Sequence, residues 1–161
     1  MSKEAIERLI KTLSKGIKVD DLKLFLQDLQ RGRFIEERDY RLLAVKNNNR
    51  IHIAYIKCFF GRPPHYRPWI EVFSINPEVD FFRTSVSTEL FELFAEALDW
   101  GESLFIEYAQ DRETERMLEL GKDVEATPLG KRLKELGFRW FKDWYFPEGA
   151  MEGGQKLQAQ K

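Results

Sequence analysis

Residues 127–148 constrain the fold of this chain more than any other segment. They read TPLGKRLKELGFRWFKDWYFPE. Thr127 followed by Pro128 is typical of a helix start, because a threonine side chain can cap free backbone N–H groups and proline needs no N–H there. Gly137 suits the position just past the helix end, and the aromatic run at 138–146 predicts a strand. The segment therefore predicts a short capped helix that exits through Leu-Gly-Phe into a strand.

Length and composition predict a single domain at residues 1–148. The chain has 161 residues, of which 43% are hydrophobic and 14% aromatic, and this is enough to bury a core. Residues 149–161 (GAMEGGQKLQAQK) have almost no apolar content, so a flexible C-terminal tail is expected. The formal net charge of −1 argues against general binding to nucleic acid or to an anionic membrane, since both usually require a basic surface.

The single cysteine, Cys58, excludes an intramolecular disulfide and is expected to be an inert core residue. One cysteine and two separated histidines, His52 and His65, supply no zinc site, so no metal is predicted. The first ten residues carry several charges and lack the apolar segment of a signal peptide. No apolar run approaches the ~20 residues of a membrane span. A cytoplasmic location is therefore expected.

Hydrophobic periodicity predicts the other elements. Two helices are expected first, each ended by a glycine, and three strands follow them. A further helix, a strand and a short charged helix opened by Asp111 then lead to the segment described above. The expected ranges are 3–13 and 20–29 for the first helices, 33–46, 50–60 and 69–75 for the strands, then helix 88–98 and strand 103–109.

This order predicts an α+β fold. Three successive strands can form an antiparallel meander, with a polar turn at residues 47–49. The strand–helix–strand step at 69–109 predicts a right-handed parallel crossover, so strands 69–75 and 103–109 are expected to be parallel neighbours. The expected architecture is a mixed sheet with an antiparallel meander, a parallel β-α-β step and flanking helices.

The Leu-Gly-Phe exit at 136–138 and the order of elements resemble the GNAT N-acetyltransferase superfamily, most clearly over residues 69–148. The resemblance implies a GNAT-like mixed sheet and transfer of an acyl group from acetyl-CoA or another acyl-CoA to an amine. The chain is also similar to an uncharacterised family of hypothetical proteins from thermophiles that is grouped with the same acyl-CoA N-acyltransferase fold. The alternative is a non-catalytic GNAT-like protein that binds a small ligand or a protein partner.

The resemblance implies a cofactor site in the segment INPEVDFFRTSVSTEL at residues 75–90. In the superfamily, backbone N–H groups of a loop with small residues bind the pyrophosphate at the start of a helix. The cofactor-binding residues so assigned are Ile75, Arg83, Ser85, Ser87 and Thr88. Val86 and Thr88 stand at the two small positions of the motif. Because β-branched side chains resist the open backbone that such a loop needs, they favour the non-catalytic alternative.

Glu71 is the candidate general base, on the strand that precedes this loop. In the sequence WIEVFSI it is expected to share its face with Trp69, Phe73 and Ile75. A carboxylate among apolar neighbours is desolvated, and this favours proton uptake. The competing interpretations are a glutamate on a solvent-facing edge and one paired with an arginine. Glu107 is a second candidate.

The usual acid of the superfamily is a tyrosine four residues before the glycine of Gly-Phe. That position holds Leu133 here, so the acid is missing from its usual place. Tyr108 and Tyr145 could replace it where geometry allows. The alternative for both is a packed tyrosine with a satisfied hydroxyl group.

Two further segments are candidates for binding a ligand or a partner. The loop at 61–68 (GRPPHYRP) could bind an anionic or planar ligand through its arginines and rings, or it could be a rigid proline loop with solvated charges. The strand at 138–146 carries rings on both faces. This predicts a homo-oligomer interface or a ligand wall, and the alternative is burial on both sides.

Overall fold

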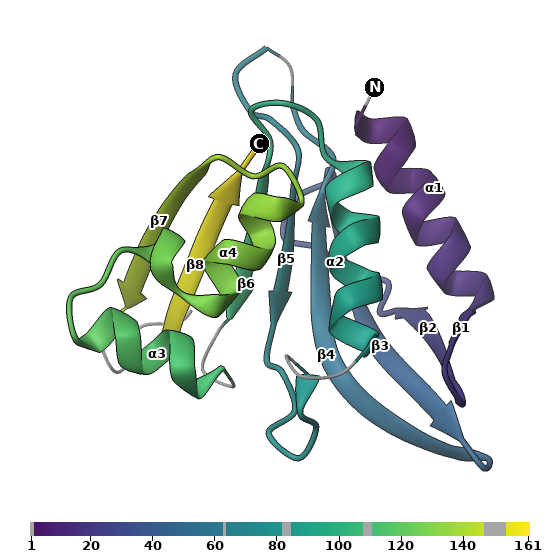
Figure 1. Ribbon diagram of the computed structural model, residues 1–161. Coiled ribbons are helices and arrows are strands. Elements are labelled where there is room, and N and C mark those ends of the chain that lie inside the picture. The colour runs from purple at the N-terminus through teal and green to yellow at the C-terminus, as the bar shows by residue number, and fades with distance from the viewer. Residues whose placement is uncertain (1, 63, 82–84, 108–110, 147–153) are drawn as a thin grey trace.

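A computed structural model describes residues 2–62, 64–81, 85–107, 111–146 and 154–161 (Figure 1). Over these residues the chain has an α+β fold built on one mixed sheet of eight strands, in the order β1-β2-β3-β4-β5-β6-β8-β7. The strands are β1 (Ile17–Val19), β2 (Leu22–Asp28), β3 (Glu37–Lys46), β4 (Asn49–Phe59), β5 (Trp69–Phe73), β6 (Ser103–Glu107), β7 (Trp140–Phe146) and β8 (Gly154–Gln160). The helices are α1 (Ser2–Lys15), α2 (Ser85–Ala97), α3 (Arg112–Glu119), the 3-10 turn η2 (Val124–Ala126) and α4 (Pro128–Glu135).

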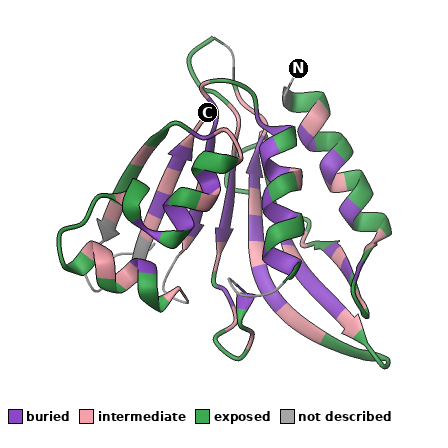
Figure 2. Ribbon diagram, viewed as in Figure 1, coloured by how far each residue is buried: buried purple, intermediate pink, exposed green. Residues whose placement is uncertain are grey.

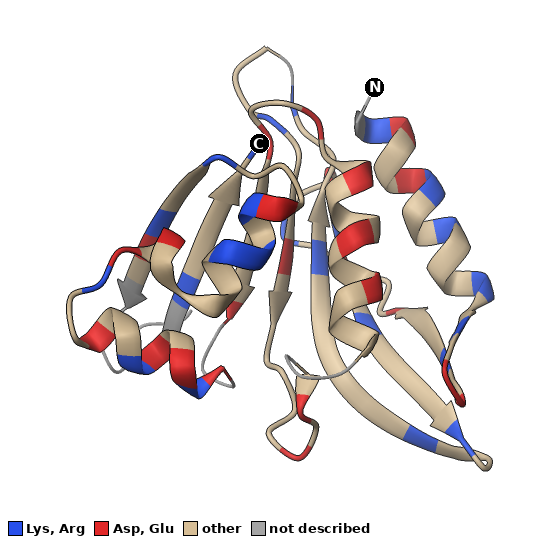
Figure 3. Ribbon diagram, in the orientation of Figure 1, with Lys and Arg blue, Asp and Glu red and all other residues tan. Residues whose placement is uncertain are grey.

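The helices α1, α2 and α4 lie on one face of the sheet (Figure 1). Their inner sides are buried against it, and their outer sides are exposed (Figure 2). The outer sides of α1 and α4 carry charged residues of both signs, whereas that of α2 carries acidic residues (Figure 3). Side chains of the central strands alternate between the two faces, and those toward the helices form the core. This set includes Leu42, Ile56, Ile70, Val72, Leu104 and Ile106, each at most 1% exposed.

The predicted parallel step is confirmed. Strands β5 and β6 pair in parallel, from Trp69 opposite Ser103 to Val72 opposite Ile106, and α2 joins them. Strands β3 to β5 form the predicted antiparallel meander, and β2 extends it by pairing with β3. Its polar turn is also confirmed, because Asn47 and Asn48 have φ of 51° and 65°, the left-handed values that asparagine tolerates.

The helix predicted at residues 20–29 is wrong. Asp20 has φ of 53° and sits in a tight turn between β1 and β2. Leu24 and Leu26 are buried on the side of the sheet that the helices cover. Leu22, Leu24 and Leu26 repeat with a period of two, as a strand requires. The additional apolar residues in this short segment, Phe25 and Leu29, produce an apparent helical spacing.

The flexible tail predicted for residues 149–161 is contradicted over 154–160, which form β8 between β6 and β7; residues 149–153 lie outside the described part. Leu157 and Ala159 are fully buried. Lys161 Nζ donates hydrogen bonds to the carbonyl oxygens of Ala95 (2.7 Å) and Leu98 (3.0 Å) at the end of α2. The segment has low apolar content because only one face of β8 meets the core.

Caps predicted at the last two helices are confirmed. The Asp111 side chain accepts a hydrogen bond from the Thr114 N–H at the start of α3. The Thr127 hydroxyl accepts one from the Gly130 N–H at 3.1 Å, and Pro128 begins α4. The buried Thr114 hydroxyl also accepts a hydrogen bond from the Leu129 N–H at 3.3 Å. The starts of α3 and α4 are therefore held together by side-chain hydrogen bonds.

Rings of the last strand segment differ in burial. Phe138 is fully buried, whereas Trp140 is 46% exposed, and β7 forms an edge of the sheet. The oligomer interface predicted at 138–146 stays a prediction. None of the described helices is both long and apolar enough to cross a membrane.

Cys58 lies on β4 with 1% exposure. Burial, together with the negative charge of Asp39, raises the pKa of its thiol from 9.0 to about 12. We expect a thiol reagent at about pH 8 to modify Cys58 only as fast as the protein unfolds, because the reactive thiolate is excluded from the folded state. Rapid modification of the native protein would contradict this burial. Since the unfolded thiol ionises first, this group should also lower stability as pH rises from 9.0 toward 12.

Candidate functional site

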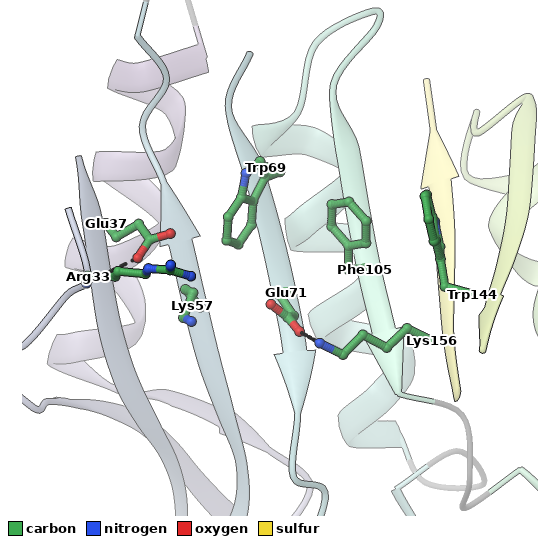
Figure 4. A pocket seen from close by; sticks show the side chains of 8 residues that line it. All are labelled: Arg33, Glu37, Lys57, Trp69, Glu71, Phe105, Trp144 and Lys156. Atoms are coloured by element: carbon green, nitrogen blue, oxygen red, sulfur yellow. Dashed lines mark hydrogen bonds and ion pairs between the residues drawn. The ribbon is translucent and has the colours of Figure 1, made fainter. Parts of the chain in front are cut away.

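The face of the sheet opposite the helices carries a cavity of about 290 Å³, which we call the charged cavity (Figure 4). Neighbouring strands supply most of its lining. Lys57 on β4 lies opposite Glu71 on β5, and Glu71 lies opposite Phe105 on β6. The described residues that line it are Arg33, Glu37, Lys57, Trp69, Glu71, Phe105, Trp144 and Lys156. The cavity therefore combines two carboxylates, three cations and three aromatic rings.

Glu71 forms an ion pair inside the charged cavity. Its Oε1 atom lies 2.5 Å from Lys156 Nζ, and the two side chains are only 12% and 13% exposed. Both sequence-based alternatives for Glu71 are thus wrong, because it is neither on a solvent-facing edge nor paired with an arginine. The prediction that Glu71 shares its face with three apolar residues is correct for two of them. Trp69 and Phe73 share the face of Glu71, but Ile75 points into the core after a turn at Ser74, whose φ is 48°.

The other charges of the cavity are less fully paired. Glu37 is 5% exposed, and its Oε2 atom accepts a hydrogen bond from the Arg33 backbone N–H at 3.1 Å. Lys57 Nζ lies 5.6 Å from the centre of the Phe73 ring, and the Arg33 guanidinium lies 5.4 Å from that of Phe34. Within the described part of the chain, neither Lys57 nor Arg33 has an ion-pair partner. Arg33 is exposed, whereas Lys57 is half-buried, and a half-buried cation without a counter-ion is a natural place for an anionic group of a ligand.

Aromatic rings form one wall of the cavity. The ring of Trp69 stacks on Phe59 at 5.6 Å and meets the edge of Phe105 at 5.8 Å. Trp144 donates a hydrogen bond from Nε1 to Gln158 Oε1 at 3.0 Å, and Gln158 donates in turn to the Ser103 hydroxyl at 3.0 Å. These contacts fix the ring positions, so the wall is preformed for a flat or apolar ligand.

A second hollow, which we call the helix-end cavity, has a volume of about 380 Å³ and lies at the starts of α2, α3 and α4. Two of the predicted cofactor residues, Ser87 and Thr88, line it together with Arg132 on α4. Asp111 and Glu113 also line it and add negative charge, although Glu113 is paired with Arg116 at 2.8 Å. Arg132 itself pairs with Glu92 at 3.1 Å and with Glu135 at 3.6 Å. The cavity therefore offers an anion the start of a helix and one guanidinium that already has carboxylate partners, and two further carboxylates oppose the anion.

The other predicted cofactor residues do not join this cavity. The Ser85 hydroxyl donates a hydrogen bond to the Asp20 carboxylate, and the Ile75 side chain is buried in the core at 4% exposure. Arg83 lies outside the described residues. Val86 is also buried in the core at 4% exposure. The motif position that usually holds a small residue is therefore filled by a packed side chain.

The structure says less about the two candidate acids, Tyr108 and Tyr145, and about the second candidate base, Glu107. Leu133, at the position of the usual tyrosine, is fully buried. Tyr108 lies outside the described residues; Tyr145 belongs to β7, but its side chain also lies outside them. Glu107 is half-buried on β6 and does not line the charged cavity.

Arginines of the loop at 61–68 are used within the protein. Arg62 donates two hydrogen bonds to the Glu36 carboxylate, at 2.9 and 2.8 Å, and Arg67 donates one to the Trp100 carbonyl at 3.3 Å. These contacts favour the interpretation of a structural loop.

His52 lies on β4. Burial, and then the positive charge of Arg41, lower the pKa of His52, so this histidine is neutral near pH 7.

Sequence reasoning missed most of the charged cavity. Lys57 lies in a strand of mostly apolar residues, in which Tyr55 and Lys57 alternate with the buried Ala54, Ile56 and Cys58. Lys156 fell in the predicted tail. There the alternation of Lys156, Leu157, Gln158 and Ala159 was a usable strand signal.

Fold and site together define an α+β protein with helices on one face of its sheet and a small cavity on the other, lined by charged side chains and aromatic rings. Comparison with known protein families identifies the family of this chain. The model of a family described as a protein of unknown function (DUF1122) matches residues 20–161, and the chain belongs to this family.

One solved structure resembles the whole chain. It is the crystal structure of a protein of unknown function, AQ1966, from Aquifex aeolicus VF5. The two chains are 36% identical with a TM-score of 0.84, and the match covers 98% of this chain and 78% of the other. No curated protein matches the sequence. The expected membership of an uncharacterised family is thus confirmed.

Proposed function

We propose that the chain is an N-acyltransferase-like protein that transfers an acyl group from acyl-CoA to an amine held in the charged cavity. The observation that carries this proposal is the contact between Glu71 and Lys156, in which the carboxylate binds a primary ammonium group at 2.5 Å. An amine acceptor has the same chemistry. It binds as an ammonium ion and must lose a proton before it can attack, and a carboxylate at this distance can accept that proton.

In the proposed reaction Glu71 takes one proton from the amine, whose nitrogen then forms a bond to the thioester carbonyl carbon. The carbon–sulfur bond breaks, the nitrogen gives up its second proton to water, and the leaving sulfur takes up one proton, so the products are an amide and a free thiol. Tyr108 and Tyr145 stay the proposed donors of that proton. Lys156 must move away from Glu71 or share it, because the ion pair occupies the carboxylate oxygen that the amine needs.

The acyl donor would not fit inside the charged cavity, whose 290 Å³ is below the ~300–1,000 Å³ of most pockets for drug-sized ligands. We propose that its phosphates bind at the helix-end cavity, where Ser87 and Thr88 lie in the first turn of α2. Arg132 would turn from its ion pair with Glu92, at 3.1 Å, toward the phosphates. The carboxylates of Asp111 and Glu113 would weaken this binding through repulsion.

A second candidate is a non-catalytic protein that binds a small ligand in the same charged cavity. The observation in its favour is the burial of Val86 and Leu133. These two positions would hold a small residue and a tyrosine in an active member of the GNAT superfamily, and here both side chains belong to the core.

A binding screen separates the two candidates. We expect acetyl-CoA or a longer acyl-CoA to raise the unfolding temperature, since a ligand at 100 times its Kd stabilises the native state by about 2.7 kcal/mol. Calorimetry would then give the affinity, and mass spectrometry would detect acylated amines. Free coenzyme A and pantetheine are matched controls for the acyl and phosphate groups. No stabilisation at millimolar acyl-CoA would exclude the acyltransferase and leave the non-catalytic candidate.

A further inference from the structure

We infer that the charged cavity takes a free aromatic amino acid, a ligand that carries a primary amine, a carboxylate and a flat side chain. This inference names the acceptor of the proposed reaction and rests on that function for its chemical role. The binding itself follows from the arrangement of charges and rings in the cavity.

Charges of opposite sign alternate across the open face. Lys57 on β4 stands between Asp39 on β3 and Glu71 on β5 in the strand ladders. Lys156 on β8 reaches Glu71 across β6, which carries Phe105 (Figure 4). Lys57 lies directly opposite Glu71 in the β4–β5 ladder, so a cation and a carboxylate stand side by side. A ligand with an amine and a carboxylate on one carbon atom can meet both, with the amine at Glu71 and the carboxylate at Lys57.

The charge balance also favours a ligand carboxylate. The lining has three cations, Arg33, Lys57 and Lys156, against the two carboxylates of Glu37 and Glu71, and 3 − 2 leaves one positive charge. A ligand carboxylate would offset this excess beside one cation, while the ammonium group of the same ligand meets Glu71. Lys57 is the natural partner, because among the described residues it has no ion-pair partner and its ammonium group lies 5.6 Å from the centre of the Phe73 ring.

The aromatic wall and the volume define the remaining part of the ligand. Trp69, Phe105 and Trp144 line one side of the cavity and offer ring faces and edges to a flat side chain. A cavity of about 290 Å³ fits a molecule of the size of one amino acid and excludes a folded partner. The N-terminal residue of a peptide would present an amide in place of the carboxylate, and Lys57 would then lack its counter-ion.

The test measures binding by calorimetry without any acyl-CoA. The probes are tryptophan, tryptamine without the carboxylate, indole-3-propionate without the amine, glycine without the ring, and the dipeptide Trp-Gly. We expect tryptophan to bind at least about tenfold more tightly than each of the others, a difference that corresponds to one missing interaction. Equal binding of tryptamine or Trp-Gly, or no binding of tryptophan, would overturn the inference.

Variants of Lys57 test whether this residue binds the carboxylate of the ligand. Lys57→Met keeps the length of the side chain and removes its charge, so tryptophan should lose about tenfold in affinity while tryptamine is unaffected. Lys57→Arg should restore most of the loss, and Lys18→Met on the exposed position of β1 is the matched control. An equal loss for tryptophan and tryptamine in Lys57→Met would contradict the proposed role. Unfolding midpoints of all variants show whether each protein is folded.

Failure of this inference can be told apart from failure of the proposed function. Tight tryptophan binding without acyl transfer from any acyl-CoA would remove the enzyme and leave the ligand. Acyl transfer to tryptamine as efficient as to tryptophan, unchanged in Lys57→Met, would retain the enzyme and remove the amino acid as its substrate.

Discussion

Replacement of Glu71 by glutamine is expected to lower acyl transfer at least about 100-fold, the lower range for the loss of a general base. Glutamine has nearly the same shape but cannot accept the proton of the amine. Initial rates with saturating acyl-CoA and amine would measure the effect. Full activity of Glu71→Gln would exclude Glu71 as the base.

The same substitution removes the counter-ion of Lys156, so a loss of folded protein must be separated from a loss of chemistry. Breaking a fully buried ion pair costs about 3–5 kcal/mol. We expect less here, about 1–3 kcal/mol, because both side chains are more than one-tenth exposed. The double variant Glu71→Gln/Lys156→Gln replaces the pair with two neutral amides and should recover most of this stability. It should not recover activity, and a double variant that does so would contradict the proposed base.

Replacement of Gly130 by alanine is expected to destabilise the protein strongly. A Cβ atom at this position would lie 2.0 Å from the carbonyl oxygen of Val124 in η2. That oxygen cannot easily retreat, because it accepts hydrogen bonds from the Thr127 hydroxyl (2.6 Å) and the Thr127 N–H (3.0 Å). The cap of α4 would therefore have to move or break.

Helix propensity and steric overlap have opposite effects on the stability of Gly130→Ala. Alanine is favoured over glycine inside a helix by about 1 kcal/mol, whereas severe overpacking costs roughly 3 kcal/mol. The net loss should be about 2 kcal/mol, measured as a fall in the free energy of unfolding in denaturant. Lys131→Ala at the exposed neighbouring position is the control and should change stability by less than about 0.5 kcal/mol. An unchanged midpoint for Gly130→Ala would mean that α4 does not approach η2 so closely.

The central part of the fold was predictable because its local signals agree. The strand–helix–strand step at β5, α2 and β6 has clear periodicities and turn residues at its ends, and the handedness rule fixes the parallel pairing. Thr127 and Pro128 combine two helix-start signals at adjacent positions. At such places local preference and tertiary structure require the same element.

The two misassigned segments lacked this agreement. In β2 the apolar residues satisfy both a helical and a strand period over seven residues, and a pattern so short cannot distinguish them. In β8 only Leu157 and Ala159 face the core, so average hydropathy indicates a tail even though the alternation indicates a strand. Tertiary burial of one face decided the structure in both cases.

The candidate site was predictable only in its centre. Glu71 stands out because it is the one charge in an apolar strand. Its partner Lys156 and its neighbour Lys57 come from β8 and β4, and their approach depends on the order of strands in the sheet. One sequence gives no direct signal for strand order across a long connection, so the ion pair and the alternation of charges could not be foreseen.

Strand β8 covers the edge of β6 in the folded sheet. Among the described elements it is the last in the chain, yet it lies inside the sheet, and β7 reaches β6 only through it. Until β8 is in place, β6 presents a row of unpaired backbone N–H and C=O groups beside the apolar side chains of Leu104 and Ile106. Such an edge is a template for pairing with other chains. The least hydrophobic strand of the sheet thus removes this edge from the folded molecule, and a molecule in which β8 has not yet docked is the one exposed to aggregation.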